Sequence, residues 1–156
     1  MTPTKQQWDE VKVDLSTFYG KDVYLRCDGY LVLARVCQAK MKLVIQLYVN
    51  GAVDPKNIWY GNERDKGQMS DIARRFYCLT SRSPSAKTVA TDLKIFGKKK
   101  CKELGWHEKT CVVFPQFATA GGFINHIKKH NESIEVLDYE AYKEARAKQE
   151  ADHATE

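Results

Sequence analysis

The sequence lacks the long apolar runs and the paired cysteines that would mark a membrane protein or a secreted one. Its longest apolar run, residues 30–34, is much shorter than the roughly 20 residues that a membrane-spanning helix needs. Residues 1–7 contain no apolar signal core. The five cysteines are an odd number without a close pair, which favours reduced thiols over a disulfide framework. We therefore expect a cytoplasmic protein that has no membrane partner.

Catalytic and cofactor signatures are also missing. The sequence contains no nucleophile elbow, no Walker phosphate-binding loop and no dinucleotide fingerprint. Gly121 and Gly122 could present backbone amides to an anion, but no Lys-Ser or Lys-Thr pair follows them. We expect these glycines to permit close helix packing instead. We predict no catalytic residue and no cofactor, and we expect that the protein is not an enzyme.

Two histidines offer a pattern that a metal could use. His126 and His130 are four residues apart on one predicted helix, a spacing that can bring both rings to one ion. Cys101, His107 and Cys111 are close in sequence, but they include no Cys-x-x-Cys knuckle. Histidines near a helix C-terminus are also favourable without a metal, because they complement the helix dipole. We assign no metal ligand, and whether His126 and His130 bind a metal stays open.

The N-terminal part of the sequence is rich in β-forming residues. Residues 23–27, 30–37 and 43–49 are β-branched and aromatic runs, and the last of them alternates between apolar and mixed positions. Asp28-Gly29 separates the first two runs and is a strong hairpin signal, because both residues tolerate a positive φ. With a short fourth strand at residues 58–60, the pattern predicts an antiparallel meander of three to four strands.

The second half alternates between helical and short β patterns. A helix is predicted over residues 70–79, with Ser70 as its N-cap, and a long one over residues 86–104 with an apolar stripe. A third helix is predicted over residues 119–130. Residues 110–114 and 134–137 are predicted as strands.

These elements predict one α+β domain over residues 1–137. Helices from the second half are expected to cover one face of the meander, and a strand around Val112 is expected to extend its sheet. Asp138 then caps an acidic helical tail, residues 138–156, which is expected to fray beyond Gln149.

Basic and acidic residues are concentrated in different parts of the chain. Between Arg64 and Lys102 there are eleven Lys or Arg residues and three acids, whereas from Glu132 onward there are eight acids and three bases. The whole chain has a net charge of only +5. A concentrated positive field attracts polyanions and acidic protein surfaces, so this asymmetry is the strongest functional signal in the sequence.

The candidate binding residues follow from this distribution. The cations expected to contact nucleic acid or an acidic partner are Arg74, Arg75, Arg82, Lys87, Lys94, Lys98, Lys99, Lys100 and Lys102. Trp59 and Tyr60 stand at the edge of a turn-rich loop. Aromatic side chains beside cations suit stacking on unpaired bases, and they equally suit a protein-binding hot spot.

Part of the basic region resembles the helix-turn-helix motif of many bacterial and phage DNA-binding proteins. Residues 71–76 match its short bracing helix, and residues 85–94 match its recognition helix. The linker, residues 80–85, is longer than the three- or four-residue turn of the motif. The resemblance implies that the following side chains face DNA: Lys87, Thr88, Thr91 and Lys94.

The leading hypothesis is a small binding protein that uses the basic face, about residues 64–102, to engage nucleic acid or a nucleic-acid-handling complex. The acidic tail would modulate access to that face. The alternative is a protein-docking inhibitor or adaptor, of the kind that phages and mobile elements encode against host defence, for example an anti-CRISPR-like protein. Such a protein would meet an acidic protein surface instead. The identity of the target and the oligomeric state stay open.

Overall fold

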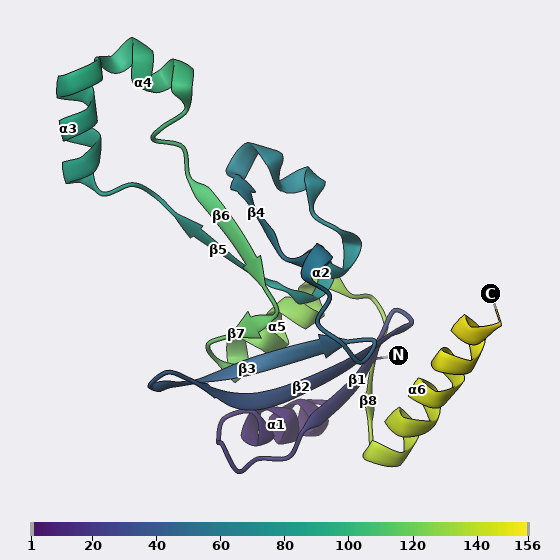
Figure 1. Ribbon diagram of the computed structural model, residues 1–156. Helices are drawn as coiled ribbons and strands as arrows, with labels where there is room; N and C mark the ends of the chain where they lie inside the picture. The colour runs from purple at the N-terminus through teal and green to yellow at the C-terminus, as the bar shows by residue number, and fades with distance from the viewer. Residues whose placement is uncertain (1, 156) are drawn as a thin grey trace.

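The protein has an α+β fold, as the sequence predicts, and the computed structural model describes residues 2–155 of it (Figure 1). Its larger sheet has five antiparallel strands in the order β7-β3-β2-β1-β8. The strands of this sheet are β1 (Val23–Cys27), β2 (Tyr30–Ala39), β3 (Lys42–Val49), β7 (Gln116–Phe117) and β8 (Ile134–Leu137). The predicted meander is confirmed for its three strands β1, β2 and β3, and the predicted strand at residues 134–137 is confirmed as well. The fourth strand that was predicted for the meander, at residues 58–60, belongs to another sheet.

The first hairpin turns at the predicted dipeptide. Asp28 and Gly29 have φ angles of +47° and +90°, the left-handed conformation that such a turn demands. The turn sets the register in which Cys27 faces Tyr30. Because side chains alternate across a strand, this register places Leu25 on one face of the sheet and Leu31 on the other.

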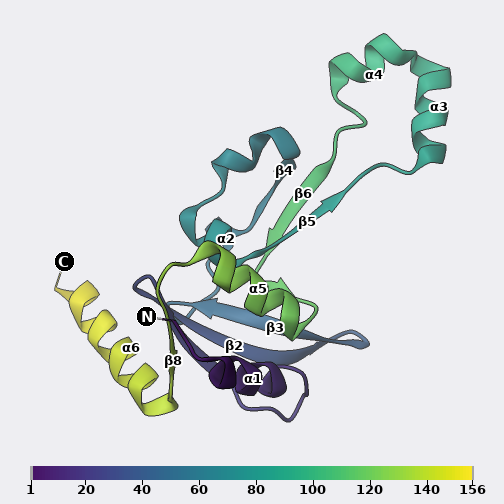
Figure 2. The same cartoon turned by 180° about the vertical axis from the view of Figure 1, so that it is seen from behind.

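Helices pack on both faces of the five-stranded sheet. One face is covered by α1 (Lys5–Asp14) and α5 (Ala120–His130), which lie in front of the strands in Figure 2. Trp8 of α1 and Phe123 and Ile127 of α5 are buried in the main core there. On the other face, α6 (Tyr139–Ala154) packs Tyr142 against Leu31. The predicted helix at residues 119–130 is confirmed, and Thr119 is its N-cap, whereas α1 is not among the predicted elements.

A second, three-stranded sheet has the order β4-β6-β5. Its strands are β4 (Trp59–Asn62), β5 (Cys78–Arg82) and β6 (Thr110–Phe114). The predicted strand around Val112 is real, but the expectation that it extends the meander is wrong, because it pairs with β4 and β5 instead. Short 3-10 turns, η1 (Pro55–Asn57) and η2 (Glu63–Gln68), flank β4.

The predicted helix at residues 70–79 is shorter than expected. Ser70 caps it as predicted, accepting a hydrogen bond from the Ala73 N–H, and α2 (Asp71–Phe76) then ends at the buried Phe76. Its last predicted turn is instead the beginning of β5. The reason is that Cys78 to Arg82 finds a partner strand in β6, and strand pairing outweighs the local helical pattern.

The predicted long helix over residues 86–104 is two helices. α3 (Ala86–Phe96) and α4 (Lys98–Leu104) meet at Gly97, whose φ of +80° interrupts the helix. None of the α3 residues, all of which the structure describes, is buried, so its apolar stripe does not cover the meander as expected. Figure 1 shows both helices at the end of an extension that β5 and β6 carry away from the larger sheet. We call residues 78–114 the arm and its helical end, residues 83–109, the tip.

Asp28 also ties three segments of the body together. One of its carboxylate oxygens accepts hydrogen bonds from Arg75 Nη1 (2.6 Å) and from the Glu132 N–H (3.0 Å), and the other accepts from the Ser133 N–H (2.7 Å). The backbone N–H groups of Ser133 and Glu132, followed by Arg75, hold the pKa of Asp28 below its usual value. The ionised carboxylate thus joins the hairpin, α2 and the segment before β8.

Replacing Asp28 with Asn should keep the left-handed turn and remove the charge. Because the pKa of Asp28 is lower in the folded state, its charge stabilises the protein above about pH 4, and this contribution is lost as the pH falls through the folded value. We expect Asp28→Asn to cost about 1–2 kcal/mol at pH 7. Urea unfolding should show a weaker acid dependence below about pH 4 in the variant. Parallel curves for the two proteins would contradict this role.

Candidate nucleic-acid interface

The arm is positioned by the pairing of β6 with both of its neighbours. Cys78 pairs with Phe114 and Arg82 pairs with Thr110, so β5 and β6 leave the body side by side. The chain between them forms the tip, where Ser85 caps α3 by accepting a hydrogen bond from the Thr88 N–H. α4 ends at Gly105, which adopts the left-handed conformation typical of a glycine at a helix C-terminus.

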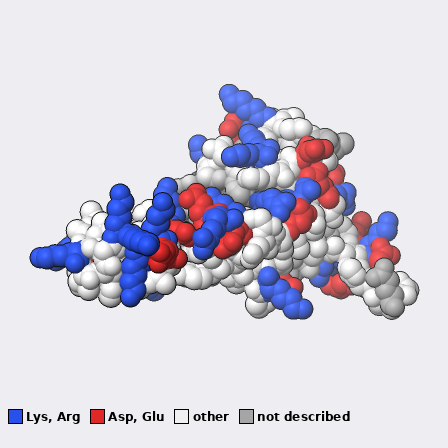
Figure 3. Space-filling view, turned by 90° about the horizontal axis from the view of Figure 1, so that it is seen from above, with Lys and Arg blue, Asp and Glu red and all other residues white. Residues whose placement is uncertain are grey.

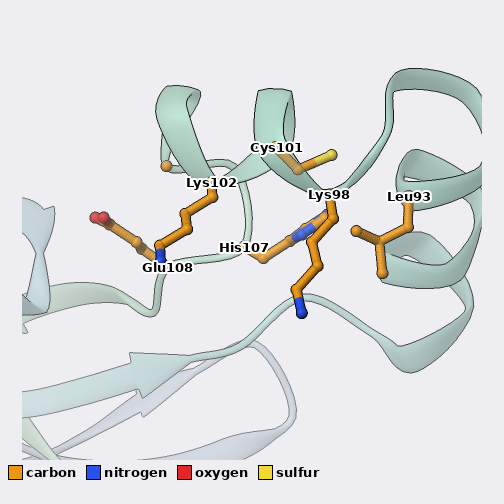
Figure 4. A pocket seen from close by; sticks show the side chains of 7 residues that line it. Leu93, Lys98, Cys101, Lys102, His107 and Glu108 are labelled. Carbon is orange, nitrogen blue, oxygen red and sulfur yellow. The ribbon is translucent and has the colours of Figure 1, made fainter.

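The tip has a small core of its own. Phe96 and Trp106 pack edge to face with ring centroids 4.7 Å apart. His107 Nε2 lies 3.2 Å from Asp92 Oδ2, which joins the end of the tip to α3. A hollow of about 350 Å³ lies beside α4, and Figure 4 shows Leu93 of α3 pointing toward Lys98 and Cys101 of α4 at its edge. These contacts hold α3 and α4 together without help from the larger sheet.

The cations of the arm are exposed and carry no ion pair. They are Arg82, Lys87, Lys94, Lys98, Lys99, Lys100, Lys102 and Lys109. Within residues 2–155, none of these eight lies within 4.0 Å of an Asp or Glu oxygen. Figure 3 shows such side chains projecting from the end of the arm, at the left, in several directions. The arm therefore presents positive charge around its tip and not on one flat face.

The acids of the arm do little to reduce this charge. The arm contains three acids, and two of them contact groups other than its eight cations: Asp92 contacts His107, and Glu108 lies 3.3 Å from Arg64 of η2. With eight bases and three acids, the arm has a net charge of +5, equal to that of the whole chain. The rest of the chain has seventeen bases and seventeen acids. All of the excess positive charge thus lies on the arm.

The structure separates the nine predicted cations into two groups. Seven of them lie on the arm, whereas Arg74 and Arg75 lie on α2 in the body. Arg75 pairs with Asp28 at 2.6 Å and with Asp71 at 2.9 Å, and its main role in this structure is to hold α2 to the hairpin. Arg74 is exposed beside it. Sequence reasoning could not separate these two groups, because the pairing of Arg75 with Asp28 joins residues 47 positions apart.

Trp59 and Tyr60 point to opposite faces of the smaller sheet. Trp59 is partly buried and packs against the main core, with its ring over Gly61, where an added Cβ would lie 2.6 Å from a ring carbon. Tyr60 is 71% exposed on the outer face. Phe114 is 48% exposed and lies on the same face. The alternating pattern of residues 110–114 could have predicted from the sequence that Phe114 points outward.

The helix-turn-helix expectation is wrong. β5 lies between α2 and α3 in the chain and directs α3 away from the body, so α2 cannot brace a recognition helix. The residues expected to face DNA on that basis are nevertheless exposed on α3: Lys87, Thr88, Thr91 and Lys94.

The acidic helix α6 lies away from the tip. It contacts β1 and β2, where Tyr142 packs against Tyr24 with ring centroids 4.8 Å apart. Figures 1 and 2 place it at the opposite end of the molecule from α3 and α4. In this structure α6 therefore leaves the basic tip uncovered.

His126 and His130 stack on each other with ring centroids 4.4 Å apart. No group of three or more His, Cys, Asp or Glu side chains able to hold a metal ion occurs within residues 2–155. Burial, followed by the nearby His130, lowers the pKa of His126 to about 4. The five cysteines are free thiols, and no helix in the described part of the chain is long and apolar enough to cross a membrane.

Stability should fall as the pH drops from about 6.5 to about 4, because unfolded His126 binds a proton in this range and folded His126 does not. Replacing His126 with Phe, beside Phe117 in the same aromatic cluster, should flatten this dependence. The exposed His153 provides a control, and His153→Gln should leave the dependence unchanged. Thermal unfolding between pH 7 and pH 4.5 measures both effects. An undiminished slope in His126→Phe would contradict the assignment.

Comparisons with protein family models, with curated proteins and with solved structures find no match to this chain. The most distinctive feature of the chain is its arm, which carries eight exposed cations and is joined to a body of balanced charge.

Proposed function

We propose that the protein is a non-enzymatic, cytoplasmic binding protein that engages nucleic acid through its arm. The observation that supports this proposal most strongly is the concentration of exposed cations without ion pairs on the arm. Phosphate groups attract such cations, and binding releases the counterions that surround a nucleic acid. This release provides a sequence-independent driving force for association.

The shape of the arm supports the same proposal. The tip extends beyond the larger sheet, so a nucleic-acid backbone could approach it without contact with the body (Figure 1). Lys98, Lys99 and Lys100 follow Gly97 in the first turn of α4, and Lys102 lies one turn farther along. Lysine is a flexible point charge that follows phosphates of varied geometry. These features suit contact with a backbone more than readout of a base sequence.

A second candidate function is docking to an acidic protein surface, as an inhibitor or adaptor of the type found in phages and mobile elements. The observation in its favour is the apolar exposure of the tip, where Ile95 is 65% exposed and Leu104 is 52% exposed. Large exposed apolar side chains among cations are typical of protein interfaces. An acidic protein partner would use both features of the tip at once.

The proposal predicts that the lysines of α4 dominate binding. A variant with Lys98, Lys99, Lys100 and Lys102 changed to Gln should bind a labelled oligonucleotide at least about tenfold more weakly near 50 mM salt. The slope of log K against log salt should become shallower by about 3 if each lysine holds one phosphate. Fluorescence anisotropy across a salt series measures both quantities.

The matched control changes four exposed lysines of the body to Gln: Lys5, Lys12, Lys143 and Lys148. It removes the same charge from α1 and α6, and it should leave affinity and slope nearly unchanged. Equal losses in both variants would show a general charge effect and contradict a specific role for the arm. Failure of the unmodified protein to bind any oligonucleotide at low salt would reject the proposed function.

A further inference from the structure

The outer face of the smaller sheet displays two aromatic rings on a continuous antiparallel ladder. Tyr60 of β4 and Thr80 of β5 flank Val112 of the central β6 in one row. Phe114 lies two residues farther along β6 and therefore points to the same side. Tyr60 and Phe114 border an open groove of about 420 Å³ on this face.

A cation without an ion pair completes this face. Arg82 ends β5 and lines the same groove, and its guanidinium has no carboxylate partner among residues 2–155. Arg82 lies two residues beyond Thr80 in β5, so its side chain follows the Tyr60 row in the direction of the tip. Aromatic surface and positive charge therefore continue from the sheet into the lysine-rich helices.

We propose that this face is a stacking platform for unpaired bases of a single-stranded nucleic acid. Tyr60 and Phe114 each stack on one base, and Arg82 and the tip lysines hold the phosphates that follow. This inference rests on the proposed function and specifies its substrate class. Stacking of bases on aromatic side chains is sequence-tolerant, because every base has a π face.

The spacing of the two rings favours a single strand over a duplex. Tyr60 and Phe114 are diagonal neighbours on adjacent antiparallel strands, a relation that separates two residues by roughly 7–8 Å and their Cβ atoms by somewhat less. This separation is about twice the 3.4 Å rise between stacked bases. Bases must separate to reach both rings, and paired bases in a duplex cannot do so without unstacking. The lysines of the tip, in contrast, can contact the phosphates of either form.

The arrangement of aromatic rings beside cations favours a nucleic acid over an acidic protein as the occupant of this face. Apolar contact alone would suit either partner. The combination of two separated aromatic rings, an adjacent guanidinium and further lysines in the direction of the tip matches alternating bases and phosphates. An acidic protein surface would supply charge for the cations but no regular series of π faces for the rings.

The test measures binding of a 12-nucleotide single strand, as DNA and as RNA, and of a hairpin duplex with the same number of phosphates. The variants Tyr60→Leu and Phe114→Leu keep apolar volume on the strands and remove the π face. Tyr60→Phe and Phe114→Tyr keep the π face. Tyr19→Leu is the control, since Tyr19 is 94% exposed on the body. Circular dichroism verifies that every variant folds.

The expected result is tighter binding of a single strand than of the duplex by the unmodified protein. Each Leu variant should weaken single-strand binding about tenfold, with duplex affinity and salt slope unchanged, and the aromatic variants and Tyr19→Leu should bind normally. Leu variants that bind the single strand normally would overturn the inference. The proposed function would still stand in that case if the α4 lysine variant binds oligonucleotides more weakly than the unmodified protein. Equal binding of polyglutamate and of the single strand would overturn the inference in favour of an acidic protein. Absence of binding to every oligonucleotide at low salt would reject the proposed function as well.

Discussion

The pairing of β6 with β4 on one side and with β5 on the other is the constraint on which the rest of the structure depends. It holds the two ends of the arm together and joins the arm to the body, where Val113 is buried in the main core. The same pairing orients alternate residues of β6 outward, so that Phe114 is exposed beside Tyr60. Without this ladder, α3 and α4 would be tethered by loops, and neither the basic tip nor the aromatic face would have a defined position.

Within residues 2–155, ion pairs to carboxylates occur among the cations of the body and not among those of the arm. Six of the seventeen Lys and Arg residues of the body have a carboxylate partner in this range, and the pairing of Arg75 with Asp28 and Asp71 stabilises the fold where α2 meets the hairpin. The cations of the arm have no such partners in the part of the chain that the structure describes. An exposed cation without a partner keeps its hydration and its field, so it can attract an anion without first breaking an existing contact. The charge of the arm is therefore available for binding, whereas that of Arg75 is engaged in folding.

Local signals predicted four of the five strands of the larger sheet and the cap of α6. The Asp28-Gly29 turn, the Asp138 cap and the strand at residues 134–137 each depend on a few neighbouring residues, and all are confirmed. The arm was not predictable in this way, because β5 acquires its structure by pairing with a strand about 30 residues away. The helix-turn-helix expectation is wrong for the same reason, because the pairing of β5 with β6 separates α2 from α3. Two further features could have been predicted from local signals. The capping box of Thr4 and Gln7 indicates the start of α1, and the alternation in residues 110–114 indicates that Phe114 is exposed.

We propose that the arm, and not the body, meets the nucleic acid. A two-dimensional ¹H–¹⁵N NMR titration of the full chain with a single-stranded oligonucleotide at low salt tests this directly. We expect shifts concentrated in β4 and in residues 78–114, with the resonances of α1, α5 and α6 nearly unchanged. Shifts concentrated on α6 or on the five-stranded sheet, or a spectrum that does not change at saturating oligonucleotide, would contradict it.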